Sequence, residues 1–328
     1  MWANQHVMIT GATGFVGGAL ARRLLDEGAQ VTAFVRSPTK AGWLRDRGAA
    51  IIEGDIAEPA AAALAVKDCR IVFHIAAATG GAYPNQVWTN VTGTRTIAQA
   101  AADAGCERFV HMSTLSVYGN CQRGDVTEDR PLAPGAAPYG QTKAAAERAL
   151  IEIAQRTGLA YSIIRPGMIY GPRSPMWTRN LFRLARLRPT PFIGDGNGFA
   201  PAIFIDDVID LTLTLALHPA ASGEAFNASS DPAPTWRQLL GAYARLAGHD
   251  DWLALPVELA YLLAGLALLF SPPRSIGRDL PDMVSFIQRR STFKMDKARR
   301  LLGWQPQIEL GEGVARCAPW LREQGLLA

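Results

Sequence analysis

Short apolar runs alternate with amphipathic helical patterns through the first half of the chain. The runs read as buried strands over residues 6–10, 30–35, 49–53, 70–76, 107–113 and 160–165. Helical patterns fill the intervals, most clearly up to residue 27 and over residues 89–104 and 139–156. Strands that alternate with helices in this way are typical of βαβ units. The pattern therefore predicts an α/β fold built on a doubly wound parallel sheet.

The rhythm changes after residue 172. Proline and glycine cluster over residues 172–201, a strand-like segment follows at residues 202–205, and the rest is mainly helical in pattern. We therefore expect a sheet domain over residues 1–172, with residues 202–230 returning to it. Residues 173–201 and 231–328 are expected to form a smaller, mainly helical C-terminal lobe.

The composition narrows the classes of protein and of site. Of 328 residues, 48% are hydrophobic and 19% are charged, which is typical of a globular chain that folds without a partner. The net charge of +4 is too small to favour nucleic acid as a partner. The 4 cysteines and 5 histidines lack metal-type spacing, so no metal site is predicted, and His74 and His111 read as hydrogen-bonded core residues. Because no secretory signal precedes the first strand pattern, we expect a reduced, cytoplasmic protein.

A glycine-rich turn joins the first strand to the first helix. Residues 10–17 read TGATGFVG, which lets the backbone approach a pyrophosphate at the positive end of the helix. The GxxGxxG spacing is one residue longer than the GxGxxG of many Rossmann dehydrogenases. The context of strand, turn and helix predicts a dinucleotide site. Its expected contacts are Gly11, Thr13, Gly14, Phe15 and Gly17.

The loop after the second strand carries no carboxylate. Residues 34–40 read FVRSPTK, whereas NAD(H) sites usually place an acidic residue here to accept from the ribose hydroxyls. The guanidinium of Arg36, with Ser37 and Lys40 beside it, suits a 2′-phosphate instead. We therefore expect NADP(H) in preference to NAD(H), the alternative being that Arg36 is a solvated surface residue. Asp55, which closes the third strand, is expected to accept from the adenine amino group.

A tyrosine and a lysine lie four residues apart at the start of a helical pattern. In YGQTK, residues 139–143, this spacing places Tyr139 and Lys143 on one helical face. An ammonium beside a phenol is predicted to lower the pKa of the phenol, so that Tyr139 exchanges protons with a carbonyl or alcohol near neutral pH. The pair alone has little specificity. It gains specificity because it follows the glycine-rich turn and a fifth strand that continues into STLSVYG at residues 113–119.

These three motifs, in this order, resemble the extended short-chain dehydrogenase/reductase family, also called the NAD-dependent epimerase/dehydratase family. Further marks are HIAA at residues 74–77, NVTGT at 90–94, RPGMIYGP at 165–172, FIDDV at 204–208 and KARRLLGW at 297–304. The resemblance runs nearly from end to end. It implies a nicotinamide-dependent enzyme on a Rossmann sheet, and a homodimer formed through the helices that follow the fourth and fifth strands.

The resemblance also implies roles for individual residues. Tyr139 is the general acid/base, Lys143 sets its pKa and binds the ribose, and Thr114 holds the substrate oxygen. Asn90 matches the family's asparagine near the active site, and Ser113 is a neighbour able to share the role of Thr114, as is Ser116. The further cofactor contacts expected are Ile56, Ala76, Ala77 and Pro166, besides Tyr139 and Lys143. The substrate contacts expected are Thr79, Ser116, Met168 and Trp177.

Two segments bear on the branch of the family. Nucleotide-sugar members usually carry an asparagine in RPxNxYGP and an arginine before the aspartate pair, and Met168 and Ala200-Pro201 stand in those places here. Without them a diphosphate would lose charge-assisted hydrogen bonds worth about 1.5 to 3 kcal/mol each. The apolar run at residues 253–270, with Glu258 as its one charge, resembles the lobe helix of 3β-hydroxysteroid dehydrogenase-like members. We read it as a buried lobe helix, with contact to a membrane surface or a spanning helix as alternatives.

The leading hypothesis is an oxidoreductase that transfers a hydride between NADP(H) and a carbonyl or secondary alcohol of a largely apolar small molecule. One alternative is a nucleotide-sugar epimerase or dehydratase with tightly bound NAD. The other is a non-catalytic dinucleotide-binding regulatory protein, against which the intact Thr114, Tyr139 and Lys143 argue. A basic amphipathic segment reads as a solvated face or as a contact for an anionic lipid or substrate, through Arg179, Arg183, Arg186 and Arg188.

Overall fold

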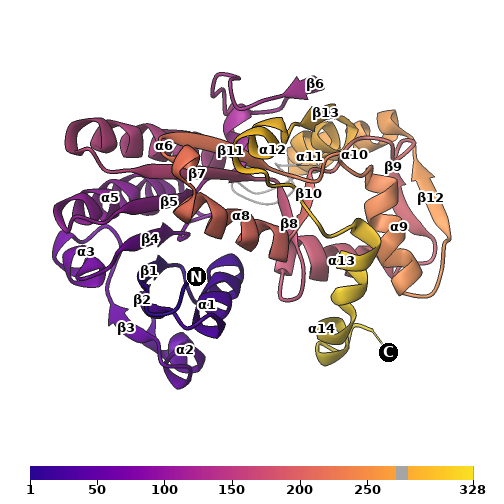
Figure 1. Cartoon of the computed structure of the whole chain (residues 1–328). Coiled ribbons are helices and arrows are strands. Elements are labelled where there is room, and N and C mark those ends of the chain that lie inside the picture. The colour runs from indigo at the N-terminus through magenta and orange to yellow at the C-terminus, as the bar shows by residue number, and fades with distance from the viewer. Residues whose placement is uncertain (271–279, 328) are drawn as a thin grey trace.

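A computed structural model describes residues 1–270 and 280–327 of the chain (Figure 1). Seven parallel strands form the central sheet, in the order β11-β7-β5-β4-β1-β2-β3. Their bounds are β1 (His6–Thr10), β2 (Gln30–Val35), β3 (Ala50–Glu53), β4 (Ile71–His74), β5 (Arg108–Met112), β7 (Tyr161–Pro166) and β11 (Glu224–Ala228). The prediction of a doubly wound parallel α/β sheet is confirmed, and the strand order reverses between β1 and β4. Ligands of such sheets bind at this switch point, beyond the carboxyl ends of the strands.

Helices cover both faces of the sheet because side chains alternate along each strand. Val7 and Ile9 of β1 pack in one hydrophobic cluster, whereas Met8, between them, packs in the other. The first cluster includes residues of α1 (Phe15–Asp26), α2 (Gly42–Asp46) and α8 (Ile205–Leu217). The second includes residues of α3 (Pro59–Val66), α5 (Gly93–Asp103) and α6 (Pro138–Thr157). The result is the three-layered half on the left of Figure 1.

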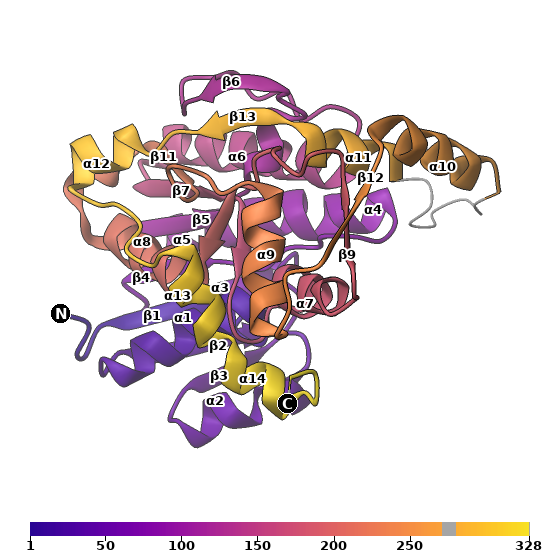
Figure 2. The same ribbon diagram turned by 90° about the vertical axis from the view of Figure 1, so that its right-hand side faces the viewer.

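The segments after β7 build the lobe that Figure 2 brings forward. Three short parallel pairs hold it together: β8 (Met168–Tyr170) with β10 (Ala202–Phe204), β9 (Thr190–Ile193) with β12 (Trp252–Leu255), and β6 (Arg123–Val126) with β13 (Arg290–Phe293). Its helices are η4 (Pro175–Asn180), α7 (Leu181–Ala185), α9 (Trp236–Leu246), α10 (Val257–Phe270), α11 (Leu280–Gln288), α12 (Asp296–Leu302), α13 (Leu310–Arg316) and α14 (Ala318–Glu323). The remaining short helical segments are η1 (Pro38–Ala41), α4 (Tyr83–Gln86), η2 (Val87–Thr92), η3 (Leu115–Tyr118) and η5 (Pro219–Ala221), and α4 and η2 continue directly into α5.

The lobe is mainly helical, as predicted, but the sequence reading missed every strand of these pairs except β10. It also missed β11, which joins the central sheet beside β7, although it expected residues 202–230 to return to the sheet domain. Where the domains divide, with residues 1–172 in one and most of the rest in the other, stays a prediction. The pair β6 and β13 joins the end of the lobe to a loop of the first half.

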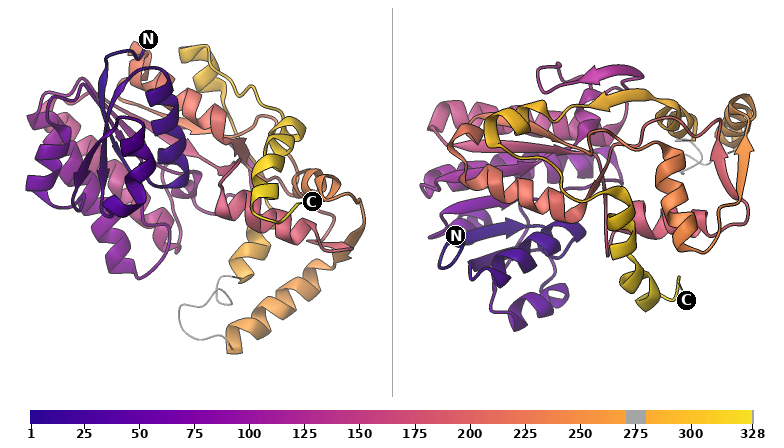
Figure 3. Two further views of the ribbon diagram at one scale, coloured as in Figure 1. Left: turned by 90° about the horizontal axis from the view of Figure 1, so that it is seen from below. Right: turned by 45° about the vertical axis from the view of Figure 1, so that its right-hand side comes forward.

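The apolar run at residues 253–270 divides at Pro256 into β12 and α10. The expectation of a buried helix is wrong for most of α10, which buries Ala260 and Ala264 against Val284 of α11. Its other face is exposed, through Leu259, Tyr261, Leu262, Leu263 and Leu266. Figure 3 shows α10 extending away from the body of the molecule. Over the described residues, no helix has both the length and the apolar character needed to cross a bilayer.

Candidate functional site

The glycine-rich turn between β1 and α1 has the close backbone approach that a dinucleotide needs. Gly11 has φ +73°, and a Cβ on it would lie 2.9 Å from the backbone nitrogen of Ala76. A Cβ on Gly17 would lie 2.2 Å from the carbonyl oxygen of Gly11. α1 begins after Gly14 with no side-chain cap, so the amides of its first turn are open to an anion. The residues at this turn therefore fit a pyrophosphate.

Thr10 ties the turn to the end of β4. Its Oγ1 accepts hydrogen bonds from the backbone nitrogens of Ile75 at 3.0 Å and Ala76 at 3.1 Å. Ala76 and Ala77 are half-buried, Ala76 lies against Gly11 of the turn, and their contact with a cofactor stays a prediction. Thr10 thus fixes the two sides of the switch point relative to each other.

The loop after β2 presents its polar groups to solvent. Arg36, Ser37 and Lys40 are exposed, and within the described part of the chain their side chains form no hydrogen bond or ion pair. Asp55 accepts from the backbone nitrogen of Ala57 at 2.9 Å. Ile56 packs its side chain against Gly93, where a Cβ would lie 2.6 Å from it. The Arg36 guanidinium is therefore available to a ligand.

β5 and α6 bring the hydroxyls of Thr114 and Tyr139 together. Thr114 follows the carboxyl end of β5, and Tyr139 lies in the first turn of α6. Burial raises the pKa of Tyr139 to about 12, while a hydrogen bond with the Thr114 side chain acts in the opposite direction. Thr114 Oγ1 also accepts from the backbone nitrogen of Ser116 at 3.2 Å. The predicted meeting of these two residues is thus present in the structure.

The predicted lowering of the Tyr139 pKa by Lys143 stays a prediction. The causes of the Tyr139 shift in this structure are its burial, which is the larger, and its hydrogen bond with Thr114. Lys143 is 1% exposed, and burial lowers its own pKa to about 7 against the opposing charge of Glu147. Its Nζ lies 3.1 Å from Nε2 of His111. A lysine that is so buried carries only part of a positive charge near neutral pH, which limits its effect on a neighbour.

The sequence placed Asn90 and Ser113 beside the reacting groups, but in the structure their side chains form hydrogen bonds with other residues. Asn90 bonds the Ala78 backbone through both amide atoms, at 2.7 and 2.9 Å, and donates to Thr142 Oγ1 at 2.9 Å. It therefore clamps the loop after β4 to α6. Ser113 is buried and donates its hydroxyl proton to Glu147, so it does not share the role of Thr114.

A buried ion pair fixes α6 to the sheet. The guanidinium of Arg165 donates to Glu147 from Nη2 at 2.7 Å and from Nε at 3.0 Å. The side chains are 7% and 0% exposed, and Arg165 Nη1 donates to the hydroxyl of Tyr118 at 2.7 Å. Such a bidentate pair fixes orientation as well as distance. Glu147 lies one turn after Lys143, so this pair also sets where Lys143 stands. Pro166, a predicted cofactor contact, ends β7 beside Arg165.

The predicted substrate residues differ in their accessibility. Thr79 and Ser116 are exposed, and Trp177 is half-buried with its ring 6.4 Å from that of Trp236. Met168 is 3% exposed within the main hydrophobic cluster. In the basic segment, the exposed side chains include those of Arg183, Arg186 and Arg188.

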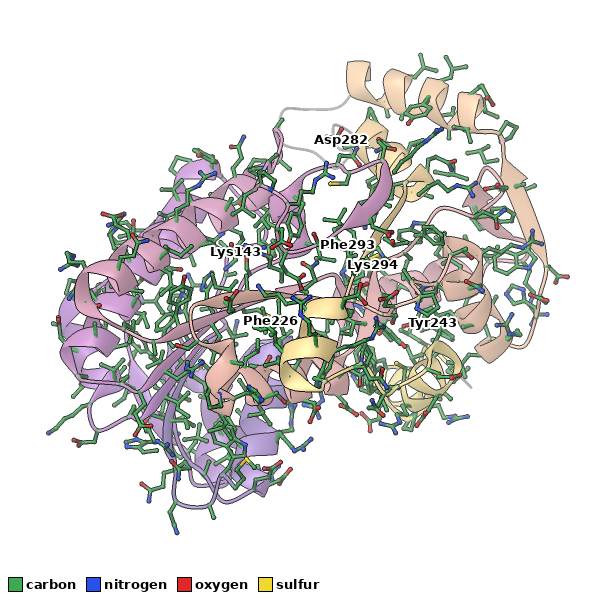
Figure 4. The ribbon with its side chains drawn as sticks, turned by 45° about the horizontal axis from the view of Figure 1, so that its top comes forward. Lys143, Phe226, Tyr243, Asp282, Phe293 and Lys294 are labelled. Carbon is green, nitrogen blue, oxygen red and sulfur yellow. The ribbon has the colours of Figure 1, made fainter. Side chains whose placement is uncertain are left out.

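Arg289 is a candidate functional residue that the sequence reading missed. Its side chain is buried between the rings of Phe286 and Phe293, with Cζ 4.2 and 5.2 Å from the two centroids. Its Nε has no hydrogen-bond partner and its guanidinium forms no ion pair among the residues that the structure describes. The ring of Phe293 in turn lies 6.1 Å, between centroids, from the ring of Tyr118. Tyr118 is the last residue of η3, the short helix that directly follows Thr114. Figure 4 shows Phe293 and Lys143 in the central region where the two halves meet.

Comparison with known proteins identifies the relatives of this chain. A UDP-glucose 4-epimerase of Mycolicibacterium smegmatis is 31% identical over 98% of this chain and 99% of its own length. A 2-alkyl-3-oxoalkanoate reductase of Stenotrophomonas maltophilia is 30% identical over 95% of this chain and 98% of its own length. The solved structure of MoeE5 in complex with UDP-glucuronic acid and NAD superposes with a TM-score of 0.76 at 27% identity, covering 97% and 99% of the two chains.

The family model that matches covers most of the sheet and the motifs described above. It is described as the NAD dependent epimerase/dehydratase family, and it matches residues 7–229. The matched residues include the glycine-rich turn, Thr114, Tyr139 and Lys143. The chain therefore belongs to the NAD dependent epimerase/dehydratase family.

Proposed function

We propose that this chain is a nicotinamide-dependent enzyme that acts on an alcohol or carbonyl carbon, with Tyr139 exchanging the proton. The observation that supports this role is the meeting of the Tyr139 and Thr114 hydroxyls beside the switch point of the sheet. A phenol with a pKa of about 12 stays protonated at neutral pH and donates to a substrate oxygen. Thr114 orients that oxygen, and Lys143 contacts the ribose. When bound, the nicotinamide supplies the hydride chemistry.

For the substrate, we propose a nucleotide sugar, on which the enzyme works as an epimerase or dehydratase with retained NAD. Arg289 carries this proposal, because burying a guanidinium without a counterion is costly and an anionic group of a ligand offsets the cost. A diphosphate suits it, since a guanidinium binds phosphate through paired hydrogen bonds. The names of the Mycolicibacterium relative and of the MoeE5 complex agree with this class of substrate.

The test is calorimetric titration of the purified protein with UDP-glucose and dTDP-glucose. An Arg289→Leu variant should bind the preferred sugar nucleotide about 10- to 100-fold more weakly, because a charge-assisted contact is lost. Arg290→Leu is the matched control, since Arg290 is exposed and pairs with Asp195 at 3.1 Å. Equal affinities in Arg289→Leu and the wild type would remove the basis for a diphosphate site.

A second candidate is a reductase that uses NADPH on a largely apolar ketone. Specific observations favour it: the free Arg36 guanidinium suits a 2′-phosphate, and Met168, Ala200 and Pro201 offer no polar side chain to a sugar nucleotide. The name of the Stenotrophomonas relative fits this class. The nucleotide released by denaturing the purified protein separates the two candidates. Stoichiometric NAD supports the epimerase or dehydratase, whereas an empty site and oxidation of NADPH by a 2-alkyl-3-oxoalkanoate support the reductase.

Two proposals concern partners. The first is a homodimer through the outer faces of α5 and α6, beside a groove of about 780 Å³ that is lined by α3, α5 and the end of α6, with Arg95, Gln99 and Arg156 among its residues. Sedimentation equilibrium tests it, and a monomer at micromolar concentration would contradict it.

The second is contact of α10 with a lipid surface, which fits the exposed leucines of that helix. Co-sedimentation with vesicles tests it, with Leu262→Glu as the variant expected to remain in the supernatant.

A further inference from the structure

Lys143 forms one hydrogen bond among the described residues, and its partner is a histidine of the neighbouring strand. Nζ lies 3.1 Å from Nε2 of His111, and both side chains are buried, at 1% and 0% exposure. An ammonium has donors only, so a charged Lys143 requires Nε2 of His111 to accept. The ring proton of His111 then lies on Nδ1, which is buried without a hydrogen-bond partner in the described part of the structure.

Hydrogen-bond accounting also fixes the second histidine, His74 of β4. Thr94 donates its one hydroxyl proton to the carbonyl oxygen of Asn90 at 2.6 Å, so it can only accept from His74 Nε2 at 3.0 Å. Nδ1 of His74 then accepts the hydroxyl proton of Thr10, also at 3.0 Å. Both ring nitrogens of His74 are thus satisfied when the ring is neutral. Thr10 completes the arrangement by accepting from the backbone beyond β4.

The two histidine rings stack on each other. His74 and His111 are register partners on β4 and β5, and their ring centroids lie 5.5 Å apart at an interplanar angle of 19°. Because His74 is held at both nitrogens, its ring is a fixed surface against which His111 lies. His111 is consequently restrained in ring orientation, and its Nε2 points at one place along α6.

We propose that His111 is a positioning residue for Lys143, which it holds through a hydrogen bond accepted at Nε2. The inference rests on the proposed role of Lys143 toward the cofactor and is independent of the substrate. Burial and the lysine charge keep the pKa of His111 well below its ordinary value, so the ring stays a neutral acceptor. The other titratable or charged groups around Lys143 are Tyr139 and Glu147 on α6, His74 on β4 and Arg165 on β7.

The first test uses the cofactor-free protein and the nitrogen-15 chemical shifts of its histidine rings. Below the Lys143 pKa of about 7, His111 should appear as the neutral tautomer protonated on Nδ1, and His74 as the neutral tautomer protonated on Nε2. Lys143→Met should change the His111 pattern and leave that of His74 in place. A His111 ring protonated on Nε2 in the wild type would overturn the proposal.

The second test measures cofactor affinity in a double-mutant cycle. His111→Phe keeps the stacked ring and removes the acceptor, and we expect it to weaken binding of the cofactor by about 10-fold or more, the effect of one hydrogen bond to a charged group. His111→Gln, whose side-chain oxygen can reach the same place, should recover part of the affinity. In a Lys143→Met background, His111→Phe should have no further effect, because the residue acts through the lysine.

The control and the possible failures are distinct. His6→Phe removes a histidine from β1 that bonds Thr32 at 2.9 Å, and it should leave cofactor affinity unchanged. Thermal unfolding of each variant checks that the fold is retained. If Lys143→Met leaves affinity unchanged, the proposed role of Lys143 itself is wrong. If Lys143→Met weakens binding and His111→Phe does not, or if the two effects add, only the role of His111 is wrong.

Discussion

Two opposing influences act on the phenol of Tyr139. Burial favours the neutral form and raises the pKa to about 12, whereas the hydrogen bond with Thr114 favours the phenolate. The structure therefore describes a phenol that is a proton donor at neutral pH. Accepting a proton requires an added positive charge nearby, for which Lys143 in its protonated form is the candidate.

The variant Tyr139→Phe removes the hydroxyl that exchanges the proton and keeps the ring that packs against its neighbours. We expect turnover to fall by about 10² to 10⁴, the usual contribution of a general acid or base. Cofactor affinity should stay within a few-fold, because the ring and its neighbours remain. Steady-state kinetics and a cofactor titration measure the two quantities. Turnover within tenfold of the wild type would mean that another group exchanges the proton.

Arg36 is the residue that decides between the two cofactors. Arg36→Asp replaces attraction for a 2′-phosphate by repulsion, so NADPH should bind more weakly than the loss of one hydrogen bond explains. NADH, which has free ribose hydroxyls, should bind equally well or better. Titration of wild type and variant with both cofactors is the measurement. A wild type that prefers NADH would show that the free guanidinium of this loop faces only solvent.

Single residues also show where sequence reading ends. The order of motifs was enough to predict that Thr114 and Tyr139 come together, and it places Lys143 in the same proposed site. The role proposed for His111 was not predictable, because a lone histidine in an apolar strand has the same pattern as a satisfied core residue. Arg289 gave no signal either, since the rings that enclose it become its neighbours only when β13 is placed beside β6.

At the scale of elements, the ends of β4 and β5 carry the two neutral histidines. Burial lowers the pKa of His74 to about 3 and that of His111 well below 6.5, whereas both take up protons near 6.5 in the unfolded chain. Below that pH the unfolded state binds more protons than the folded state. Folding stability should therefore decline as the pH falls from about 6.5 toward about 3, by up to about 1.4 kcal/mol per pH unit for each histidine.

Urea unfolding of the wild type and His111→Phe, from about pH 7 to about pH 5, checks this expectation. The variant should lose stability with a slope shallower by about the share of one histidine. Lys143 does not affect this comparison, because it is protonated in both the folded and the unfolded state over the lower part of this pH range. Its own contribution to the pH dependence of stability falls between its folded pKa of about 7 and its higher unfolded pKa. Parallel curves for the two proteins would mean that His111 takes up its proton over the same pH range in the folded and the unfolded state.

Strands of the central sheet were predictable because parallel strands, buried on both faces, read as continuous apolar runs. β4, whose sequence is IVFH, is of this kind, and every residue in it is buried. The sequence reading missed β11 because its sequence, EAFNA, starts with a charged residue and contains an asparagine. The paired strands of the lobe that the sequence reading missed are only three or four residues long, and β6 and β12 are also largely exposed. Length and burial, more than propensity, therefore decide which strands a sequence reveals.

At the scale of the whole molecule, a continuous row of side chains joins the lobe to the sheet. It runs from Trp177 through Trp236 and Phe286 to the guanidinium of Arg289, then through Phe293 to Tyr118 and Arg165. Arg165 ends the row at Glu147, one turn from Lys143. An anion bound to Arg289 would therefore be linked to Lys143 through a continuous series of packed side chains.

The place of β11 in the sheet has a consequence for biosynthesis. Until residues 224–228 leave the ribosome, β7 is an outer strand whose backbone groups have no partner on one side, and such strands invite pairing with another nascent chain. The finished protein protects its own outer strand differently, since the backbone nitrogen of Asn227 donates to the carboxylate of Glu128 at 2.8 Å. A chain released early, near residue 172, has neither the strand nor this protection. Premature termination should consequently yield a self-associating fragment rather than a small working protein.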